Sequence, residues 1–345
     1  MIVQRLHSAA AEGERRFMRK KNTALLLLSL ILISLTACGT KTKPAEPGKN
    51  SIKVIAAIFP AYDWTKNILG EDPAGMELTL LADSGVDLHS YQPSVEDILS
   101  VSTCDLFIYV GGESDQWVTD ALKQAVNPNM RVIKMLDVLG DTAKEEKTLE
   151  GMQAEEEDDD EETEYDEHVW LSLRNAERIC DAITAELSAL DPANAAVYQK
   201  NSAAYKEKLS ELDQAYERTV SESSLKTLLF GDRFPFRYLA DDYGLTCYAA
   251  FSGCSAETEA SFETISFLAG KMDELSLPAV LTIERTDQRI AGTIVQNTQA
   301  KDQQILTLNS MQSVSAKDMA DGVTYLSVMA DNLAVLEKAL EKEEN

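Results

Sequence analysis

Short runs of apolar residues alternate with helical patterns along the chain from residue 51 onward. In the first half, apolar runs of strand length predict strands at residues 52–59, 76–81, 105–110 and 131–135. Between them, the pattern predicts helices over residues 62–69 and 94–101, the second with Ser94 as its cap and Asp97 three positions later. Strands that alternate with helices favour a mainly parallel α/β sheet.

The second half of the chain repeats this alternation. Apolar runs predict further strands at residues 226–230, 246–250, 279–284 and 304–308. Helical patterns over residues 261–275 and 286–299 separate some of them. We therefore expect two similar lobes, each a mainly parallel sheet flanked by helices.

One long helical pattern connects the two halves. Pro192 suits the first turn of a helix that has Asp191 as its cap, and the pattern continues to about Glu222. An apolar stripe follows one face of this helix, formed by Tyr198, Tyr205, Leu209, Leu212, Tyr216 and Val220. A helix of this length spans roughly 45 Å. Because no Gly/Ser hinge interrupts it, we expect one rigid helix that restricts the relative motion of the lobes.

The first 37 residues have the pattern of an export leader. A basic triplet at residues 19–21 precedes an apolar run at residues 24–35, and Thr36, Ala37 and Cys38 follow. As a helix this run spans only about 18 Å, too short for a bilayer core of about 30 Å, which favours a secretory signal. Its end resembles a bacterial lipoprotein signal. The resemblance implies cleavage before Cys38, a lipid on that cysteine, and a location at the extracytoplasmic face of the cell membrane.

These features divide the chain, whose 345 residues exceed one typical domain, into five parts. We expect a leader and signal peptide (1–37), a lipidated tether (38–50), an N-terminal α/β lobe (51–190), a linking helix (191–222) and a C-terminal α/β lobe (223–345).

The charge of the chain bears on its partners. The formal net charge is −26, and the six basic and two acidic residues of the leader leave about −30 for the rest. This balance excludes nucleic acid as the natural partner. Acidic residues occupy eleven of the thirteen positions from 155 to 167, so we expect an exposed, mobile acidic loop at 154–167. This loop is either a solvated insertion or a set of weak carboxylate sites that concentrates divalent cations.

Histidine is scarce, and its two positions beyond the leader are informative. His7 precedes the signal, which leaves His89 in a loop between a predicted strand and helix, and His168 at the end of the acidic segment. Neither lies on an apolar helix face. Imidazole is the commonest protein ligand for zinc and similar metals, so we predict that both bind a divalent metal ion.

The cysteines are less decisive. Cys104 and Cys180 lie in apolar segments and are expected to be buried thiols. Cys247 and Cys254 are the closest pair, but their spacing does not establish a disulfide.

From residue 52 to the C-terminus, the chain resembles the zinc/manganese class of ABC-transporter solute-binding proteins, metal-binding receptors whose two lobes are joined by a long helix. The motif Gly-x-x-x-His-x-Tyr-x-Pro is matched from Gly85 to Pro93, and Asp-x-His-x-Trp-Leu from Asp166 to Leu171. The start of the long helix, Asp-Pro-x-Asn, is present at residues 191–194. The resemblance implies a metal held between the lobes, with two ligands from each.

The resemblance is incomplete in the second lobe. The position at which the family has its third metal ligand, a His or Glu, holds Arg233 in this chain. A guanidinium has no lone pair for a metal. Either Asp232 replaces it, or water completes a site of fewer protein ligands, or Arg233 pairs with a carboxylate and no metal binds. The fourth ligand is expected at Asp287, with Glu284 and Cys254 as secondary candidates.

The expected function is that of a lipid-anchored receptor, not an enzyme, that passes a divalent metal to the permease of an ABC importer. Two imidazoles with carboxylates suit Zn²⁺ and accommodate Mn²⁺ at a higher coordination number. We expect a monomer that binds the membrane through the lipid on Cys38. The alternatives are an exported zinc-dependent hydrolase, for which no His-Glu-x-x-His motif is present, and a surface adhesin or scaffold with a vestigial metal site.

Overall fold

A computed structural model describes residues 51–70, 75–153, 164–255 and 259–341. The predicted leader, Cys38 and its tether, and most of the acidic segment (154–163) lie outside the described residues. Residues 50–345 form one compact unit, and the description below concerns this unit alone. No helix among the described residues is long and apolar enough to cross a membrane.

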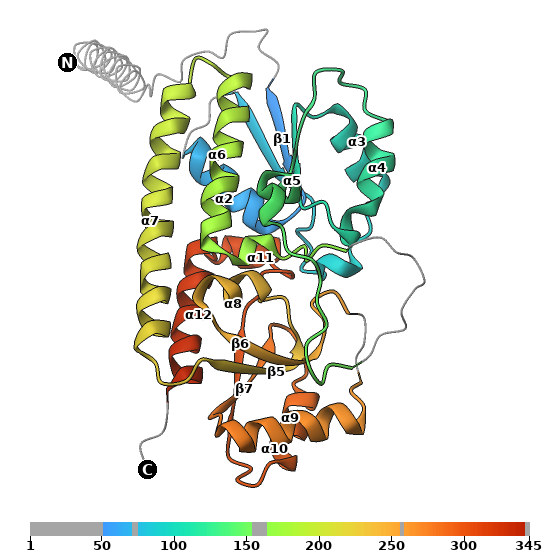
Figure 1. Ribbon diagram of the computed structural model, residues 1–345. Helices are drawn as coiled ribbons and strands as arrows, with labels where there is room; N and C mark the ends of the chain where they lie inside the picture. Colours follow the sequence, from blue (N-terminus) through green and yellow to red (C-terminus); the bar gives the residue numbers. More distant parts are fainter. Residues whose placement is uncertain (1–50, 71–74, 154–163, 256–258, 342–345) are drawn as a thin grey trace, which may run out of the picture. The chain divides into compact units, whose positions relative to one another are not determined.

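Two four-stranded parallel sheets organise this unit (Figure 1). The first sheet has the order β2-β1-β3-β4, made of β1 (Ile52–Ala56), β2 (Met76–Leu80), β3 (Leu106–Tyr109) and β4 (Arg131–Lys134). The second has the order β6-β5-β7-β8, made of β5 (Thr227–Arg233), β6 (Thr246–Phe251), β7 (Ala279–Ile283) and β8 (Gln304–Leu308). The predicted fold class, two similar parallel α/β lobes joined by a long helix, is confirmed.

Helices flank both sheets. The first half contains α2 (Phe59–Leu69), α3 (Val95–Thr103), α4 (Gln116–Lys123), α5 (Met135–Leu139) and α6 (Leu173–Leu190). The second half contains α8 (Arg237–Tyr243), α9 (Phe262–Leu275), α10 (Arg289–Asn297), α11 (Ala316–Ala320) and α12 (Tyr325–Leu340). The helices α9 and α10 enclose a smaller apolar core against one face of the second sheet, and α12 packs on the same sheet from the main core.

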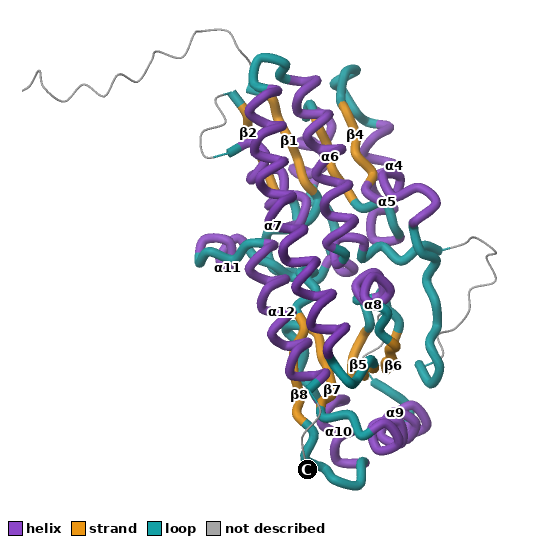
Figure 2. The backbone as a smooth tube through the Cα atoms, turned by 60° about the vertical axis from the view of Figure 1, so that its left-hand side comes forward, coloured by secondary structure: helices purple, strands orange, loops and turns teal. Residues whose placement is uncertain are grey.

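The long helix α7 (Ala195–Glu222) packs against α6 and α2 from the first half and against α12 from the second (Figures 1 and 2). Its predicted apolar stripe is buried, apart from a partly buried Leu212. Two of its tyrosines anchor it: Tyr205 Oη donates to Asp63 of α2 (3.3 Å), and Tyr216 Oη donates to the carbonyl of Met329 in α12 (2.6 Å). One continuous core therefore includes both halves.

Several predicted boundaries were wrong, among them that of the helix expected at 286–299, which spans Arg289–Asn297. The strand expected at 52–59 ends at Ala56, because Pro60 fits the first turn of α2, which begins at Phe59. The long helix begins at Ala195 and not at Pro192, which lies in the turn before it.

Candidate functional site

The candidate site is made by loops that follow strands of both sheets. The loop after β2 carries the short 3-10 helix η1 (Leu88–Ser90), and the segment before α6 carries a second one, η4 (Val169–Leu171). From the other half come the loop after β6 and the loop after β8. The carboxyl ends of parallel strands are where ligand sites form in α/β sheets, since the connecting loops converge there.

His89 and His168 face each other at this place, as the sequence analysis required. Their Nε2 atoms lie 3.2 Å apart, and the two rings are inclined by 59°. His168 is fully buried, and the His89 side chain is 12% exposed. Each backbone is fixed locally by an aspartate two residues earlier: Asp87 Oδ1 accepts from the N–H of His89 (3.0 Å), and Asp166 Oδ1 from that of His168 (2.8 Å).

The opposite ring nitrogens contact oxygen atoms. His168 Nδ1 lies 3.0 Å from Asp166 Oδ1, while His89 Nδ1 lies 2.7 Å from Ser114 Oγ and 3.1 Å from Glu167 Oε1. Protons on both Nδ1 atoms satisfy these contacts and leave the Nε2 lone pairs pointing toward each other. Carboxylates that hold imidazoles in this way fix the tautomer and raise the basicity of the coordinating nitrogen.

The two carboxylates that contact the histidines, Asp166 and Glu167, belong to the end of the acidic segment. The expectation of an exposed loop up to residue 167 was therefore wrong at these two residues. Asp166 and Glu167 are each 1% exposed. Glu167 Oε1 accepts from Ser114 Oγ (2.6 Å), so the carboxylate has partners that compensate for its burial. Burial opposes its charge, but hydrogen bonding to His89 and the charges of both histidines lower the pKa of Glu167 to about 2.

Three carboxylates raise the pKa of His168. Burial of its ring opposes the charged form, yet Asp166, Glu167 and Glu146 together hold the pKa of His168 above its ordinary value. Glu146 is partly buried, which raises its pKa to about 7, and its Oε1 accepts from the backbone N–H of Gly253 (3.2 Å). The carboxylates around His168 thus favour its positive charge despite burial.

Gln312, in the loop after β8, completes the contacts of the pair and was not predicted. Its Nε2 lies 2.8 Å from His89 Nε2 and 2.6 Å from His168 Nε2, so one amide group faces both imidazole lone pairs. Its Oε1 lies 2.9 Å from Ser310 Oγ. The sequence signal was weak: Gln312 follows a predicted strand, as His89 and Cys254 do, but an amide is not a characteristic metal ligand.

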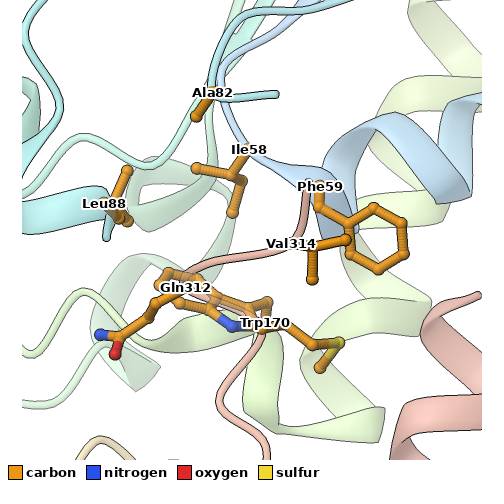
Figure 3. A pocket seen from close by; sticks show the side chains of 8 residues that line it. Ile58, Phe59, Ala82, Leu88, Trp170, Gln312 and Val314 are labelled. Atoms are coloured by element: carbon orange, nitrogen blue, oxygen red, sulfur yellow. The ribbon is translucent and has the colours of Figure 1, made fainter. Parts of the chain in front are cut away.

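A small pocket adjoins this amide (Figure 3). Ile58, Phe59, Ala82 and Leu88 line it from the first half, and Met311, Gln312 and Val314 from the second, with Trp170 of η4 between them. The Trp170 indole N–H donates to the carbonyl of Ser310 (2.8 Å), so Gln312 is the polar side chain that borders both the pocket and the histidine pair.

Glu284 orders this loop and does not join the histidines. Its carboxylate accepts from Ser310 N (2.7 Å), from Ser310 Oγ (2.9 Å) and from Gln312 N (3.1 Å). The carboxylate predicted as a secondary ligand therefore holds the backbone that presents Gln312.

Asp232 and Asp287 do not reach the histidines either. Asp232 accepts from the N–H of Arg233 (2.9 Å) and from that of Ile283 (3.3 Å), so it joins the ends of β5 and β7. Asp287 is exposed, and its carboxylate pairs with Arg289 at the start of α10. Local partners hold both carboxylates apart from the histidines in this structure, and their role as ligands stays a prediction.

Arg233 pairs with a carboxylate, which is the structural half of one alternative left open above; the other half, that no metal binds, stays a prediction. Its guanidinium donates to Asp87 Oδ2 at 2.6 Å. Burial opposes ionisation of this aspartate, but the hydrogen bond and charge of Arg233 bring the net pKa of Asp87 below its ordinary value. The Asp87 carboxylate therefore compensates the positive charge of Arg233 beside the His89 loop.

Cys254, in the loop after β6, does join the pair. Within the described parts of the chain, His89, His168 and Cys254 form the group of potential metal-ligating residues whose ligand atoms all lie within 4.8 Å of one another. Cys247 and Cys254 are both free thiols, as are the buried Cys104 and Cys180.

Comparison with known proteins shows which family the chain belongs to. Residues 54–339 match the model of the family described as "Zinc-uptake complex component A periplasmic". The chain belongs to this family. It is 32% identical over 328 residues to the zinc-binding lipoprotein AdcA of Streptococcus pneumoniae strain R6, covering 94% of this chain and 62% of AdcA. It is 29% identical to the high-affinity zinc uptake system protein ZnuA of Bacillus subtilis, covering 94% of this chain and 99% of ZnuA.

Solved structures of family members agree with the fold. The Zn(II)-bound ZnuA-like domain of S. pneumoniae AdcA is similar with a TM-score of 0.66 and 28% identity, covering 85% of this chain and all of that domain. The metal-dependent lipoprotein YcdH of B. subtilis gives a TM-score of 0.68 and 26% identity, covering 84% and 99%. The chain spans about three fifths of the full AdcA proteins it matches.

Proposed function

We propose that this protein is a receptor that binds Zn²⁺ between its two lobes through His89 and His168 and delivers the ion to an ABC importer. The observation that carries the proposal is the 3.2 Å separation of the two Nε2 atoms, with each Nδ1 held by oxygen atoms. Two imidazoles bound to one tetrahedral zinc at about 2.0–2.1 Å have nitrogens about 3.3 Å apart. The pair therefore needs little rearrangement to chelate an ion.

The related proteins support zinc as the cargo. AdcA of S. pneumoniae is named a zinc-binding lipoprotein, and its ZnuA-like domain has been solved with Zn(II) bound. Mn²⁺ remains the alternative cargo, although the affinity order of divalent metals favours zinc at nitrogen ligands. The names of the family and of these relatives describe binding and uptake and not catalysis, so the hydrolase alternative is not supported. Solved structures named laminin-binding adhesins share the fold at 24% identity, a likeness that supports the fold and does not extend adhesion to this chain.

The test is a zinc titration of the purified protein against a chelator of known affinity. We expect one tight site, which His89→Ala and His168→Ala each weaken by at least about a hundredfold, the upper range found when even outer partners of a metal ligand are removed. Gln296→Ala, a change of an exposed polar residue in α10, serves as the control and should leave affinity unchanged. Wild-type affinity in either histidine variant would contradict the proposal.

The membrane attachment and the partner form a separate part of the proposal. A lipid on Cys38 would hold the receptor at the extracytoplasmic face, where it meets the permease as a monomer. The naming of AdcA as a lipoprotein and the periplasmic description of the family support this location. Intact-mass analysis of the membrane-extracted protein should show a lipidated N-terminal cysteine, and Cys38→Ala should release the protein from membranes. An unmodified residue 38 would contradict this part alone.

A further inference from the structure

Two imidazoles leave a zinc ion with half of the four ligands that it takes in closed sites. Both come from the first half of the chain, so the second half has to contribute if the ion is to lie between the lobes. Asp232, Asp287 and Glu284 have local partners, and the Arg233 guanidinium cannot ligate. Among the described His, Cys, Asp and Glu residues, Cys254 is the one from the second half whose ligand atom lies within 4.8 Å of a ring nitrogen of both histidines.

The backbone around Cys254 is shaped to place it there. A side chain at Gly253 would bring its Cβ to 2.9 Å from His168 Cε1, so glycine allows this loop to pack directly against the imidazole. The Gly253 N–H is held by Glu146 (3.2 Å), a residue of the first half. Cys254 Sγ itself lies 3.4 Å from Glu167 Oε1, the same oxygen that contacts His89. The thiol is thus part of the network that orients the histidines.

We propose that Cys254 is the metal ligand contributed by the second half, so that the site consists of two imidazoles and one thiolate. This inference rests on the proposed function and specifies which cations that site accepts. Coordination replaces the S–H bond with a metal–sulfur bond and releases one proton. Thiolates prefer soft and borderline ions, whereas Mn²⁺ prefers oxygen ligands. The site therefore selects Zn²⁺, Cd²⁺ and Co²⁺ over Mn²⁺.

The Cys254 sulfur needs only a small displacement to bind an ion held by the two histidines. A zinc ion with Zn–N bonds of about 2.0–2.1 Å and a Zn–S bond of about 2.3 Å places sulfur roughly 3.5 Å from each nitrogen. One ring nitrogen of each histidine and the Cys254 sulfur already lie within 4.8 Å of one another. A rotamer change or a slight approach of the loop after β6 closes this difference. Binding would therefore draw the loop of the second sheet toward the histidines of the first half.

Absorption spectroscopy with Co²⁺ and Cd²⁺ as probes tests the assignment, because a thiolate ligand gives a sulfur-to-metal charge-transfer band in the ultraviolet. The full chain with one equivalent of either ion should show this band. Cys254→Ser should lose it and bind zinc at least about tenfold more weakly, while Cys247→Ser, the matched control at a free cysteine outside the site, should retain both. Cys254→Asp should lower the ratio of Zn²⁺ to Mn²⁺ affinity, since it replaces sulfur with oxygen.

The outcomes separate the two proposals. If wild-type protein binds the ions at His89 and His168 without a charge-transfer band, or if Cys254→Ser keeps the band, the thiolate assignment is wrong and the receptor function stands. If neither Zn²⁺ nor the probe ions bind, both proposals are wrong. Circular dichroism of each variant verifies that the fold is retained.

Discussion

The guanidinium of Arg233 donates a hydrogen bond of 2.6 Å to the carboxylate of Asp87, two residues before His89. Arg233 ends β5 of the second sheet, and Asp87 caps η1, which carries His89. The other Asp87 oxygen accepts from the His89 backbone N–H (3.0 Å). A residue that cannot bind a metal thus connects the second half of the chain to the loop that positions a histidine of the site.

The Arg233–Asp87 pair should contribute measurably to stability. Its side chains are only 18% and 23% exposed, so solvent screens the pair less than a surface pair. In a double-mutant cycle with Arg233→Met and Asp87→Asn, we expect a coupling free energy of about 1–2 kcal/mol at pH 7, measured by urea denaturation. The exposed pair Lys123–Asp120 is the control, with coupling near zero. Equal coupling free energies in the Arg233–Asp87 and Lys123–Asp120 cycles would show that the Arg233–Asp87 pair does not stabilise the connection between the two halves.

Replacing Gln312 with glutamate should tighten zinc binding. The Gln312 amide nitrogen lies within hydrogen-bond distance of both Nε2 atoms, so a carboxylate at this position adds an anionic oxygen ligand where the amide now donates. We expect a gain in affinity of about tenfold or more, equivalent to about 1.4 kcal/mol, in a chelator competition titration.

Gln312→Ala is the matched variant for this change. It removes the amide without adding a ligand, so its zinc affinity should stay well below that of Gln312→Glu. If the two variants bind zinc equally, residue 312 does not reach the ion.

Zinc affinity should fall as the pH decreases, and the fall should steepen below the raised pKa of His168, which lies above the ordinary histidine value of 6.5. The proton competes with the metal for His168, and neighbouring carboxylates raise the pKa of this imidazole despite its burial. Below that raised pKa, the dissociation constant should increase about tenfold per pH unit for each proton displaced. Titrations between pH 8 and pH 5.5 measure this slope.

Asp166→Asn provides the control for the pH dependence. Removing the carboxylate beside His168 Nδ1 lowers the pKa of His168, so the fall in affinity should begin at a lower pH than in the wild type. A pH-independent affinity in the wild-type protein would argue against histidine ligation.

Tyr325→Phe should destabilise the fold. The Tyr325 hydroxyl is buried at the start of α12 and donates to the carbonyl of Trp170 (2.6 Å), in the η4 segment that follows His168. Its loss leaves that carbonyl without this donor, at a cost of about 1–3 kcal/mol in the free energy of unfolding. Chemical denaturation measures the change. Tyr165→Phe, at a side chain 47% exposed, should change stability by less than about 0.5 kcal/mol.

The sequence was sufficient for the two parallel sheets and the long helix because the relevant signals are local. Alternation of apolar runs and helical patterns predicted the parallel sheets, and the stripe from Tyr198 to Val220 predicted α7. Helix α6 was not predicted, although it is 18 residues long and has Ser172 as its cap. The division into domains given above stays a prediction, since both halves share one core.

The site was predicted only in part. His89 and His168 were found because histidine is scarce and both lie outside apolar helix faces. Asp232 and Asp287 were predicted from their spacing to family motifs, but spacing does not show that Ile283 and Arg289 already satisfy them.

By itself, the sequence determined the fold class, the long connecting helix and the two histidines, because periodicity and residue type act over short stretches of chain. Only the tertiary structure decided that Cys254, Gln312 and Glu167 surround the pair while Glu284 supports a loop. These residues come from separate loops, and their approach depends on how two sheets and their connecting helix pack. The distances between loops of the two sheets depend on how the shared core packs. No local pattern in the sequence predicts that packing.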